Sequence, residues 1–300
     1  GAKISYSKSE VLAADVLLKI APPTLEEIKE MSPGACLISA LQLENQSAEF
    51  IHALNEKKIT AVAFEYLEDK VGGMPVVRAM SEIAGSTVML IASEYLSSVN
   101  DGKGLILGGV TGVPPTQVVI IGAGTVAEYA ARTALGLGAN IKVFDNHIYK
   151  LRRIKQLIGQ QIYTSTIDNF TLSQALAEAD VVIGALRAEK GRNKIVVTEE
   201  MVANMMHGSI IIDVGIDQGG CIETARMTSH EAPVYQIHDV IHYCVPNIAS
   251  RVARTASYSL SNIFTPIVLQ MADLGGAEEM IFNYKWFLRG VYTYRGSLTH

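Results

Sequence analysis

The chain has 300 residues, with 25 lysines and arginines against 30 aspartates and glutamates, which gives a net charge of −5. Hydrophobic residues make up 49% of it and charged residues 18%, and this composition excludes a disordered chain. The length suits about two domains. Mild acidity without a basic run argues against a nucleic acid or an anionic membrane surface as partner.

Two uncharged runs bear on the membrane question. The run 104–127 is long enough to cross a bilayer, but its glycines and the pair Pro114-Pro115 predict a loop followed by a buried strand. The run 255–272 is interrupted by polar residues and Pro266, which predicts a buried core helix. We therefore expect no membrane partner. The first residues lack a signal peptide, and the missing initial Met indicates a processed, tagged or truncated chain.

Three cysteines also indicate the setting of the protein. Cys36, Cys221 and Cys244 are widely spaced and form no CxxC motif, so neither a disulfide framework nor a zinc ribbon is predicted. Cys221 and Cys244 are expected to be small buried residues and not nucleophiles. A reducing, cytoplasmic location fits best.

The first half of the chain alternates between strand-like and helix-like patterns. A capping box from Thr24 to Glu27 predicts the start of a helix. Strands are predicted at 15–20, 35–41 and 59–64, and helices at 24–28, 47–56 and 78–99. The alternation favours a parallel sheet covered by helices. The glycine-rich connection 102–115 is the predicted domain boundary.

A second alternation begins at Gln117. Strands are predicted at 118–121, 141–144, 161–164, 181–183, 210–213 and 234–237, with helical patterns between most of them. Six strands in this order are typical of a doubly wound dinucleotide-binding domain. A helix at 249–271 should lead back to the first domain, which the last residues complete. The alternation predicts an α/β protein of two domains, and a family resemblance set out below implies that both are Rossmann-like, with parallel, doubly wound sheets and a cleft between them. A substrate domain takes 1–114 and 273–300, without its N-terminal part, and an NAD-binding domain takes 115–272.

The strongest local signal is a G-x-G-x-x-A motif between a buried strand and a helix. Gly122 permits the tight turn, Gly124 lets the backbone approach a pyrophosphate, and Ala127 allows close packing of helix on strand. The helix that begins at Thr125 and Val126 offers amide donors to the phosphates. These residues predict a dinucleotide site.

Asp145 ends the second strand of this domain, about 20 residues after the second glycine. A carboxylate there accepts hydrogen bonds from the adenosine ribose and repels a 2′-phosphate, so NAD is the predicted cofactor. The alternative is an Asp that only caps the next helix. The basic residues Lys150, Arg152 and Arg153 follow, and a solvated helix face is the expectation for them. Lys150 is nevertheless a candidate cofactor-binding residue.

Several stretches together resemble a known family. They are Gly-Gly-Val-Thr-Gly-Val-Pro-Pro at 108–115, the glycine turn at 122–125, Ile-Asp-Val-Gly-Ile-Asp-Gln-Gly-Gly-Cys at 212–221, the stretch 238–247 with Tyr-Cys-Val-Pro-Asn, and the C-terminus 289–300. They are similar to alanine dehydrogenase and to the wider group that it forms with the α subunit of nicotinamide nucleotide transhydrogenase. The resemblance implies NAD-linked oxidative deamination of L-alanine, with the active site in the interdomain cleft. A homo-oligomer is also expected.

The resemblance implies roles for particular residues. Asp217 matches the active-site aspartate beside the nicotinamide, although an Asp followed by Gln-Gly-Gly can also be a simple turn. Ser81 is similar to a serine that touches the cofactor from the first domain. Asn247 and Ile248 match a stretch that lines the nicotinamide pocket. Asp145 is similar to the ribose-binding acid.

On the substrate side the chain departs from the family. The substrate-binding lysine of the family falls on Ala21, and the catalytic histidine falls on Gln42. Gln42 can hydrogen-bond a carbonyl but cannot transfer a proton near neutral pH. Lys19, two residues before Ala21, points to the same strand face. The chain also begins about fifty residues into the family pattern.

The sequence therefore leaves three hypotheses open. The first is an NAD-dependent dehydrogenase acting on a small amino acid or 2-oxo acid, with Asp217 as the catalytic residue. The second is an NAD(H)-binding relative without alanine turnover, and the third is a protein like the transhydrogenase α subunit. His238, Asp239 and His242 would suit a metal only on a helix with a third ligand, and no metal is predicted.

Overall fold

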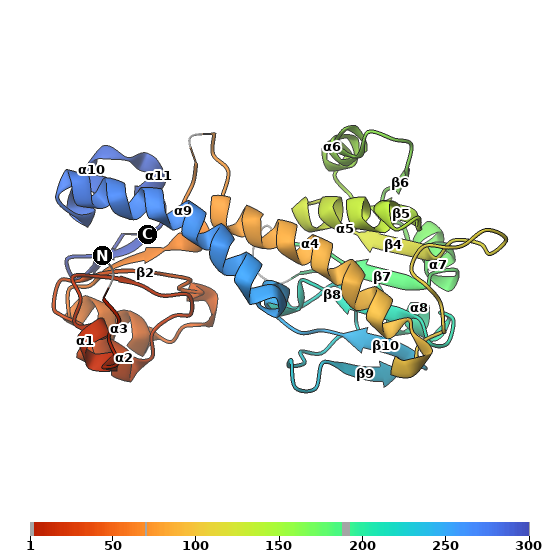
Figure 1. Cartoon of the computed structure of the whole chain (residues 1–300), viewed down its shortest axis with the longest axis horizontal. Helices are drawn as coiled ribbons and strands as arrows, with labels where there is room; N and C mark the ends of the chain where they lie inside the picture. The colour runs from red at the N-terminus through yellow and green to blue at the C-terminus, as the bar shows by residue number, and fades with distance from the viewer. Residues whose placement is uncertain (1–2, 70, 188–192, 300) are drawn as a thin grey trace. The chain divides into compact units, whose positions relative to one another are not determined.

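The computed structural model describes residues 3–69, 71–187 and 193–299. The chain forms two compact units, unit 1 from residues 1–79 and 258–300 and unit 2 from residues 80–257. Helix α4 (Pro75–Tyr95) leads from unit 1 into unit 2, and helix α9 (Ala253–Leu274) leads back, as the ribbon shows (Figure 1). Each of the two chain crossings therefore falls within a helix.

These boundaries differ from the sequence-based ones, which lay at 114/115 and 272/273. The difference arises because each long helix contributes to both units. Val88 and Met89 in the second half of α4 belong to the core of unit 2, whereas Phe264 and Met271 of α9 belong to the core of unit 1. Side-chain packing thus places the boundaries earlier than the glycine-rich connection suggested.

Unit 1 is built on a five-stranded sheet of order β1-β2-β3-β11-β12. The strands are β1 (Val16–Leu18), β2 (Cys36–Ser39), β3 (Thr60–Ala63), β11 (Val291–Tyr294) and β12 (Ser297–Leu298). The first three are parallel, and β11 pairs antiparallel with β3. The C-terminal residues therefore complete this unit, as the sequence predicted.

Helices cover both faces of that sheet, and each face has its own core. Helices α1 (Lys8–Leu12), α2 (Leu25–Glu30) and α3 (Ala48–Glu56) lie on one face, and α9, α10 (Ala277–Asn283) and α11 (Lys285–Leu288) lie on the other (Figure 1). The predicted capping box is present, because Thr24 accepts a hydrogen bond from the Glu27 amide and Glu27 accepts one from the Thr24 amide. This box satisfies two amides at the start of α2.

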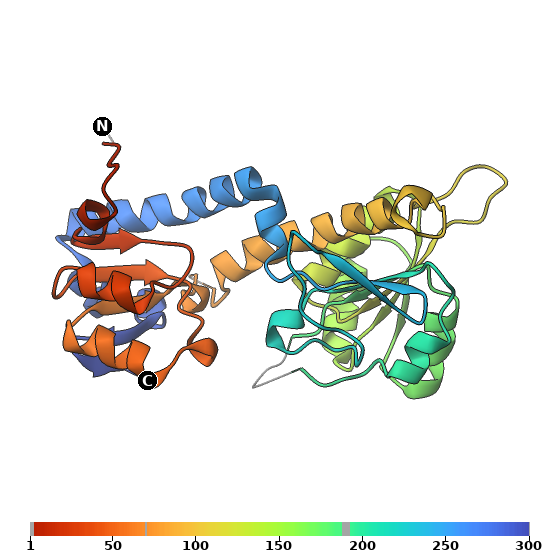
Figure 2. The same cartoon turned by 90° about the horizontal axis from the view of Figure 1, so that it is seen from below.

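Unit 2 is built on a seven-stranded sheet of order β6-β5-β4-β7-β8-β10-β9, whose strands are labelled in Figure 1. Figure 2 shows the same ribbon from below. The strands are β4 (Gln117–Ile121), β5 (Asn140–Phe144), β6 (Tyr163–Ser165), β7 (Val181–Gly184), β8 (Ile210–Asp213), β9 (Val234–Ile237) and β10 (Val240–Tyr243). The helices are α5 (Thr125–Gly136), α6 (Ile148–Ile158), α7 (Asn169–Ala177) and α8 (Glu199–Ala203). The order reverses at β4, which is the doubly wound dinucleotide-binding topology that the sequence predicted.

The sixth parallel strand is not the predicted one. Strand β10 pairs parallel with β8, and the predicted strand at 234–237 is β9, which pairs antiparallel with β10 at the sheet edge. A tight turn joins the two strands, with His238 and Asp239 both at positive φ, 53° and 58°. This geometry is that of a two-residue hairpin turn.

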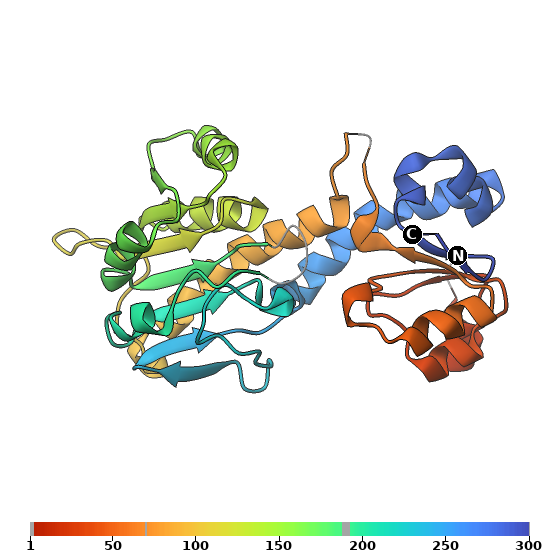
Figure 3. The ribbon, with the colours of Figure 1, turned by 180° about the vertical axis from the view of Figure 1, so that it is seen from behind.

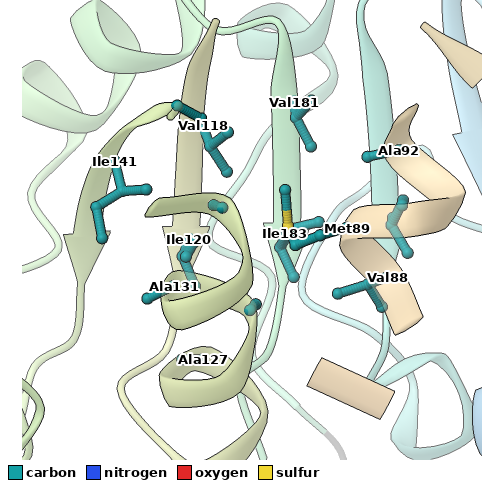
Figure 4. Close-up of a cluster of buried hydrophobic side chains, with 14 of the residues drawn as sticks. Val88, Met89, Ala92, Val118, Ile120, Ala127, Ala131, Ile141, Val181 and Ile183 are labelled. Carbon is teal, nitrogen blue, oxygen red and sulfur yellow. The ribbon is translucent and has the colours of Figure 1, made fainter. Parts of the chain in front are cut away.

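Alanines and β-branched residues form the central core of unit 2. Val88 and Met89 of α4, Ala127 of α5, and Ile120 and Ile183 of the sheet point toward one another (Figure 4). Burying one such large aliphatic side chain contributes about 1.5–3 kcal/mol. Helix α4 is long and apolar enough to cross a bilayer by length and composition, and this packing accounts for much of its apolar character.

The glycine-rich connection between α4 and β4 forms a loop that projects from unit 2, drawn in yellow (Figure 3). Asp180, at the start of β7, ties this connection to the sheet. Its carboxylate pairs with Lys103 and accepts a hydrogen bond from the Gln117 amide at 2.8 Å. The connection is therefore anchored at both of its ends.

Candidate functional site

The glycine turn follows β4 directly, and its geometry requires glycine at the first position. Gly122 has φ +113°, and a Cβ there would lie 2.5 Å from the Ala185 carbonyl oxygen at the end of β7. Gly124 caps α5 without a side-chain hydrogen bond, and a Cβ there would meet no atom within 4 Å. The amides at the start of α5 thus adjoin open space, as a phosphate-binding turn requires.

A second glycine holds α4 against α5. A Cβ on Gly85 would lie 2.4 Å from the Val126 carbonyl oxygen and 2.8 Å from the Tyr129 Cβ. The backbones of the two helices therefore approach as closely as glycine allows. Ser81 lies one turn before Gly85 on α4 and is partly buried. It belongs to unit 2 of the structure, and its contact with the cofactor stays a prediction.

Asp145 is buried where β5 ends, beside the glycine turn. Its Oδ2 accepts a hydrogen bond from the Ala123 amide at 2.8 Å. Its Oδ1 accepts one from the His147 amide at 2.7 Å and lies 3.0 Å from His147 Nδ1. The carboxylate therefore shapes the turn and the start of α6. The ribose contact that the sequence predicts for Asp145 stays a prediction.

The basic residues of α6 have different surroundings. The Lys150 Nζ lies 5.9 Å from the centre of the Tyr149 ring, and Arg152 is exposed. Arg153 also has an exposed side chain, but its Nη2 donates to the Ala123 carbonyl oxygen at 3.3 Å. Arg153 is therefore solvent-exposed, as expected, and in addition it contacts the glycine turn.

Asp217 lies in the loop that follows β8, on the 3-10 helix η4 (Ile216–Gln218), with an exposed side chain. Because β4, β5, β8 and β10 run parallel, their carboxyl ends share one sheet edge. The glycine turn, Asp145 and the Asp217 loop therefore lie along the same edge of unit 2. Ligands bind at this edge in doubly wound sheets.

Asp213, which was not predicted from the sequence, organises that loop. Its Oδ1 accepts from the Gly215 amide at 3.0 Å and its Oδ2 from the Cys221 amide at 2.9 Å. A Cβ on Gly220 would lie 2.6 Å from Oδ2, so the loop closes tightly around the carboxyl group. Burial raises the pKa of Asp213 to about 6. The sequence signal was an Asp at the end of an apolar strand, followed by glycines.

Asn247 and Ile248 follow β10 at the same sheet edge. Asn247 is exposed with φ 54°, and its carbonyl oxygen accepts from the Ser250 amide and hydroxyl. Ile248 is buried in the core of unit 2. The two residues therefore form the turn into η5 (Ile248–Val252), with Asn247 as the accessible member. Their contact with the cofactor stays a prediction.

The His-Asp-x-x-His run forms a hairpin and not a helix. His242 is buried on β10, with Nε2 2.8 Å from the Thr224 hydroxyl and Nδ1 2.9 Å from the Val240 carbonyl oxygen, and burial lowers its pKa. His238 faces Glu199 instead, at 2.9 Å. Within residues 3–69, 71–187 and 193–299, no group of three His, Cys, Asp or Glu side chains suits a metal ion.

Cys221 and Cys244 are buried, as predicted, and Cys36 is buried as well. Burial raises the pKa of Cys36 to about 12 and of Cys244 to about 11, and it also raises that of Cys221. Thiols in this state are poor nucleophiles at neutral pH.

In unit 1, the parallel strands β1, β2 and β3 end at one edge, where Ala21, Gln42 and Glu65 follow them. Lys19 does not compensate for Ala21, because its Nζ lies 3.1 Å from Glu27 and donates to the Pro22 carbonyl oxygen at 3.2 Å. Gln42 has φ 48°, and its backbone N–H donates to Glu65 Oε1 at 2.8 Å.

Glu65 is a titratable group at this edge that the sequence analysis did not single out. Burial raises its pKa. Its Oε2 is buried and accepts no hydrogen bond from the residues that the structure describes. Little in the sequence points to Glu65, since it acquires its environment only when β2 and β3 pair.

Comparisons with known proteins match the whole chain. The profile of the N-terminal domain of alanine dehydrogenase/PNT matches residues 1–84, and that of the C-terminal domain matches residues 88–300. An alanine dehydrogenase of Methanococcus maripaludis is 37% identical over 302 residues, which cover 100% of this chain and 80% of that protein.

Solved structures agree with this relationship. A structure of L-alanine dehydrogenase matches with a TM-score of 0.94 and 33% identity, covering 100% of this chain and 82% of that one. A transhydrogenase from Sinorhizobium meliloti matches with a TM-score of 0.81 and 23% identity, covering 98% and 82%. At that identity the second match concerns the fold alone.

Proposed function

The chain belongs to the alanine dehydrogenase/PNT family, and from this premise we propose that it is an NAD-dependent amino-acid dehydrogenase. Its substrate is a small 2-amino acid or 2-oxo acid. The observation that carries the proposal is the glycine turn of unit 2, with Asp145 bonded to it through the Ala123 amide.

The residues of unit 2 fit a dinucleotide. The start of α5 at Thr125 and Val126 offers amides next to open space at Gly124, which suits a pyrophosphate. Asp145 keeps acceptor capacity for a ribose hydroxyl, because a carboxylate offers about four lone pairs and three donors are in place. Lys150 would lie beside the adenosine and Ser81 beside the turn. When bound, NAD accepts or returns a hydride.

We assign Asp217 as the catalytic residue of this reaction. It lies exposed beyond the carboxyl end of β8, and the carboxyl group of Asp213 fixes the loop that carries it. A carboxylate in this place accepts and returns the proton that accompanies hydride transfer or ammonia exchange. Asn247 and Ile248, after the neighbouring strand β10, would border the nicotinamide.

A second candidate is an NAD(H)-binding relative that does not turn over L-alanine. The structure of unit 1 favours it, because Ala21 and Gln42 supply neither a cation nor a proton-transfer group and Lys19 pairs with Glu27. A protein like the transhydrogenase α subunit is a third candidate, supported by the likeness in fold.

The experiment that separates these functions follows NADH formation at alkaline pH with a panel of amino acids, while NADH binding is titrated by fluorescence. Turnover of one amino acid supports the dehydrogenase. Binding without turnover of any panel member supports the second or third candidate. A chain that binds no NADH would contradict all three.

The setting of the protein belongs to the same proposal. Its cysteines are free and buried, and its net charge is −5, which supports a cytoplasmic protein with a small-molecule substrate and without a nucleic-acid or membrane partner. We expect a homo-oligomer. Size-exclusion chromatography with light scattering tests this, and a monomeric mass would contradict it.

A further inference from the structure

Two opposite charges contact the same residue of the glycine turn. The Ala123 amide donates to the buried carboxylate of Asp145 at 2.8 Å, and the Ala123 carbonyl oxygen accepts from the Arg153 guanidinium at 3.3 Å. The Asp145 side chain is only 3% exposed, whereas Arg153 is an exposed residue. The charge that the turn presents to solvent at this point is therefore positive.

The Asp145 carboxylate and the Arg153 guanidinium also differ in how many further hydrogen bonds each can make, and the difference again favours Arg153. Three donors from Ala123 and His147 already occupy the Asp145 carboxylate, so about one lone pair remains. A guanidinium carries five N–H donors in a planar fork that matches phosphate oxygens, and the turn accepts one of them from Arg153. Arg153 therefore keeps donors for an anion beside Asp145.

We propose that Arg153 forms an anion subsite at the adenosine end of the cofactor site, where it receives a 2′-phosphate. This inference rests on the proposed dinucleotide site and refines its specificity. Asp145 still favours NAD(H), because its negative charge repels a phosphate. Arg153 offsets part of that repulsion, so NADP(H) binds with a smaller disadvantage than Asp145 alone would impose.

Neighbouring cations do not share this position. Arg152 is the adjacent residue, also exposed on α6, and makes no hydrogen bond to the turn in the described part of the chain. Lys150 lies beside the Tyr149 ring. Arg152→Gln removes the same charge from the same helix as Arg153→Gln, so it is a matched control for long-range electrostatics.

The test titrates NADH and NADPH by fluorescence against the wild-type chain, Arg153→Gln and Arg152→Gln. We expect Arg153→Gln to weaken NADPH binding about tenfold and NADH binding less than about threefold. Arg152→Gln should leave the ratio of the two affinities within about twofold. Arg153→Lys keeps the charge without the fork and should fall between. Melting temperatures confirm that each variant is folded.

Competition with fragments isolates the phosphate. Adenosine 2′,5′-bisphosphate and 5′-AMP are titrated against bound NADH, and Arg153→Gln should weaken the bisphosphate selectively. Equal effects of Arg153→Gln and Arg152→Gln on the affinity ratio, in a chain that binds NADH, would overturn the inference and leave the proposed function standing. A wild-type chain that binds neither dinucleotide would overturn both.

Discussion

Asp145 accepts three hydrogen bonds from its own chain, and the proposed site adds one from a ribose hydroxyl. We predict that the wild-type chain binds NADH more tightly than NADPH. Asp145→Ala should reduce the ratio of the NADPH dissociation constant to the NADH dissociation constant about tenfold, because the repulsion of a 2′-phosphate is lost. It should also weaken both cofactors, since the turn loses its support. The titrations described for Arg153 measure this.

The control for this prediction is Asp145→Asn, which removes the charge and keeps the size. It should reduce this ratio of dissociation constants, as Asp145→Ala does. Arg153→Gln should have the opposite effect, because it increases the difference between the NADH and NADPH affinities. Tighter binding of NADPH than of NADH by the wild-type chain would contradict the predicted preference for NAD.

Asp217→Asn keeps the size of the side chain but removes the proton exchange. We expect it to abolish oxidoreductase activity towards the best substrate of the amino-acid panel and to leave NADH affinity within a few-fold. Asp239→Asn, an exposed carboxylate in the hairpin turn, is the control and should spare both. Melting temperature, NADH affinity and turnover are measured on each variant. Intact turnover with a lowered melting temperature would assign Asp217 a turn role only.

The roles of single residues could be predicted from sequence only where their partners lie close by in the chain. Gly122 and Gly124 could be identified because the turn and its helix are contiguous in the chain. The role of Asp213 could not be predicted because its hydrogen-bond donors include Cys221, eight residues later, and the loop must fold before the two residues meet. Arg153 needed the fold to bring α6 to the glycine turn.

Among the elements, the loop after β8 has its own pH dependence through Asp213, whose pKa rises from an ordinary 3.8 to about 6. The folded state thus keeps a proton that the unfolded chain releases. The stability from this group is fully present below pH 4 and is lost as the pH rises through 6. The loss is on the order of 2–3 kcal/mol.

Asp213→Asn should remove this pH dependence and also destabilise the loop by about 1–3 kcal/mol, because an amide accepts at only one of the two atoms. Urea unfolding at pH 4 and pH 7 measures it. The difference in free energy of unfolding between the wild type and the variant should be larger at pH 4 than at pH 7. Asp273→Asn, exposed on α9, is the control. A difference that does not change with pH would contradict the assignment.

The contact between α4 and α5 gives a second prediction for the elements. Gly85→Ala would place a Cβ 2.4 Å from the Val126 carbonyl oxygen, so the helices must separate. We expect a loss of about 1–3 kcal/mol in stability and weaker NADH binding, since α5 begins at the phosphate turn. Gly136→Ala, which meets open space in α5, should instead stabilise by up to about 1 kcal/mol. Unfolding and NADH titrations compare them, and equal effects would contradict the prediction.

The elements themselves were largely predictable, because hydrophobic periodicity is a local property. Strand β10 is one exception. The hairpin turn His238-Asp239 lacks the Asn-Gly or Asp-Gly signal that usually marks such turns, and the buried His242 interrupts the apolar pattern of the strand. A polar residue that is satisfied by Thr224 inside a sheet cannot be recognised from sequence.

For the whole molecule, the order of units could be predicted but their boundaries could not. Composition places a boundary where glycine and proline accumulate, at 102–115. The chain instead passes between units inside α4 and α9, whose patterns continue without interruption. Which half of such a helix packs in which unit depends on partners such as Ile120 and Phe287, far away in the sequence.

The activity of the whole chain provides the last prediction. Amino-acid oxidation needs a group that holds the substrate carboxylate and one that moves protons. In unit 1, Ala21 and Gln42 provide neither, and Lys19 is held by Glu27 and the Pro22 carbonyl oxygen, so Asp217 of unit 2 must move protons without the family's histidine. Loss of a positioned acid or base typically costs 10²–10⁴-fold in rate. We therefore expect L-alanine to be turned over poorly or not at all, even where NADH binds.

The measurement is NADH formation from L-alanine at alkaline pH, with the double variant Ala21→Lys, Gln42→His beside the wild-type chain. The double variant should be the faster of the two, because it restores a cation and a proton-transfer group at the ends of β1 and β2. Lys19→Gln is the control. It should lower the melting temperature by loosening the start of α2 and leave the rate unchanged, since its partners are Glu27 of that helix and Pro22 shortly before it. A wild-type rate of about 10 s⁻¹, ordinary for an enzyme, would show that other residues supply both functions.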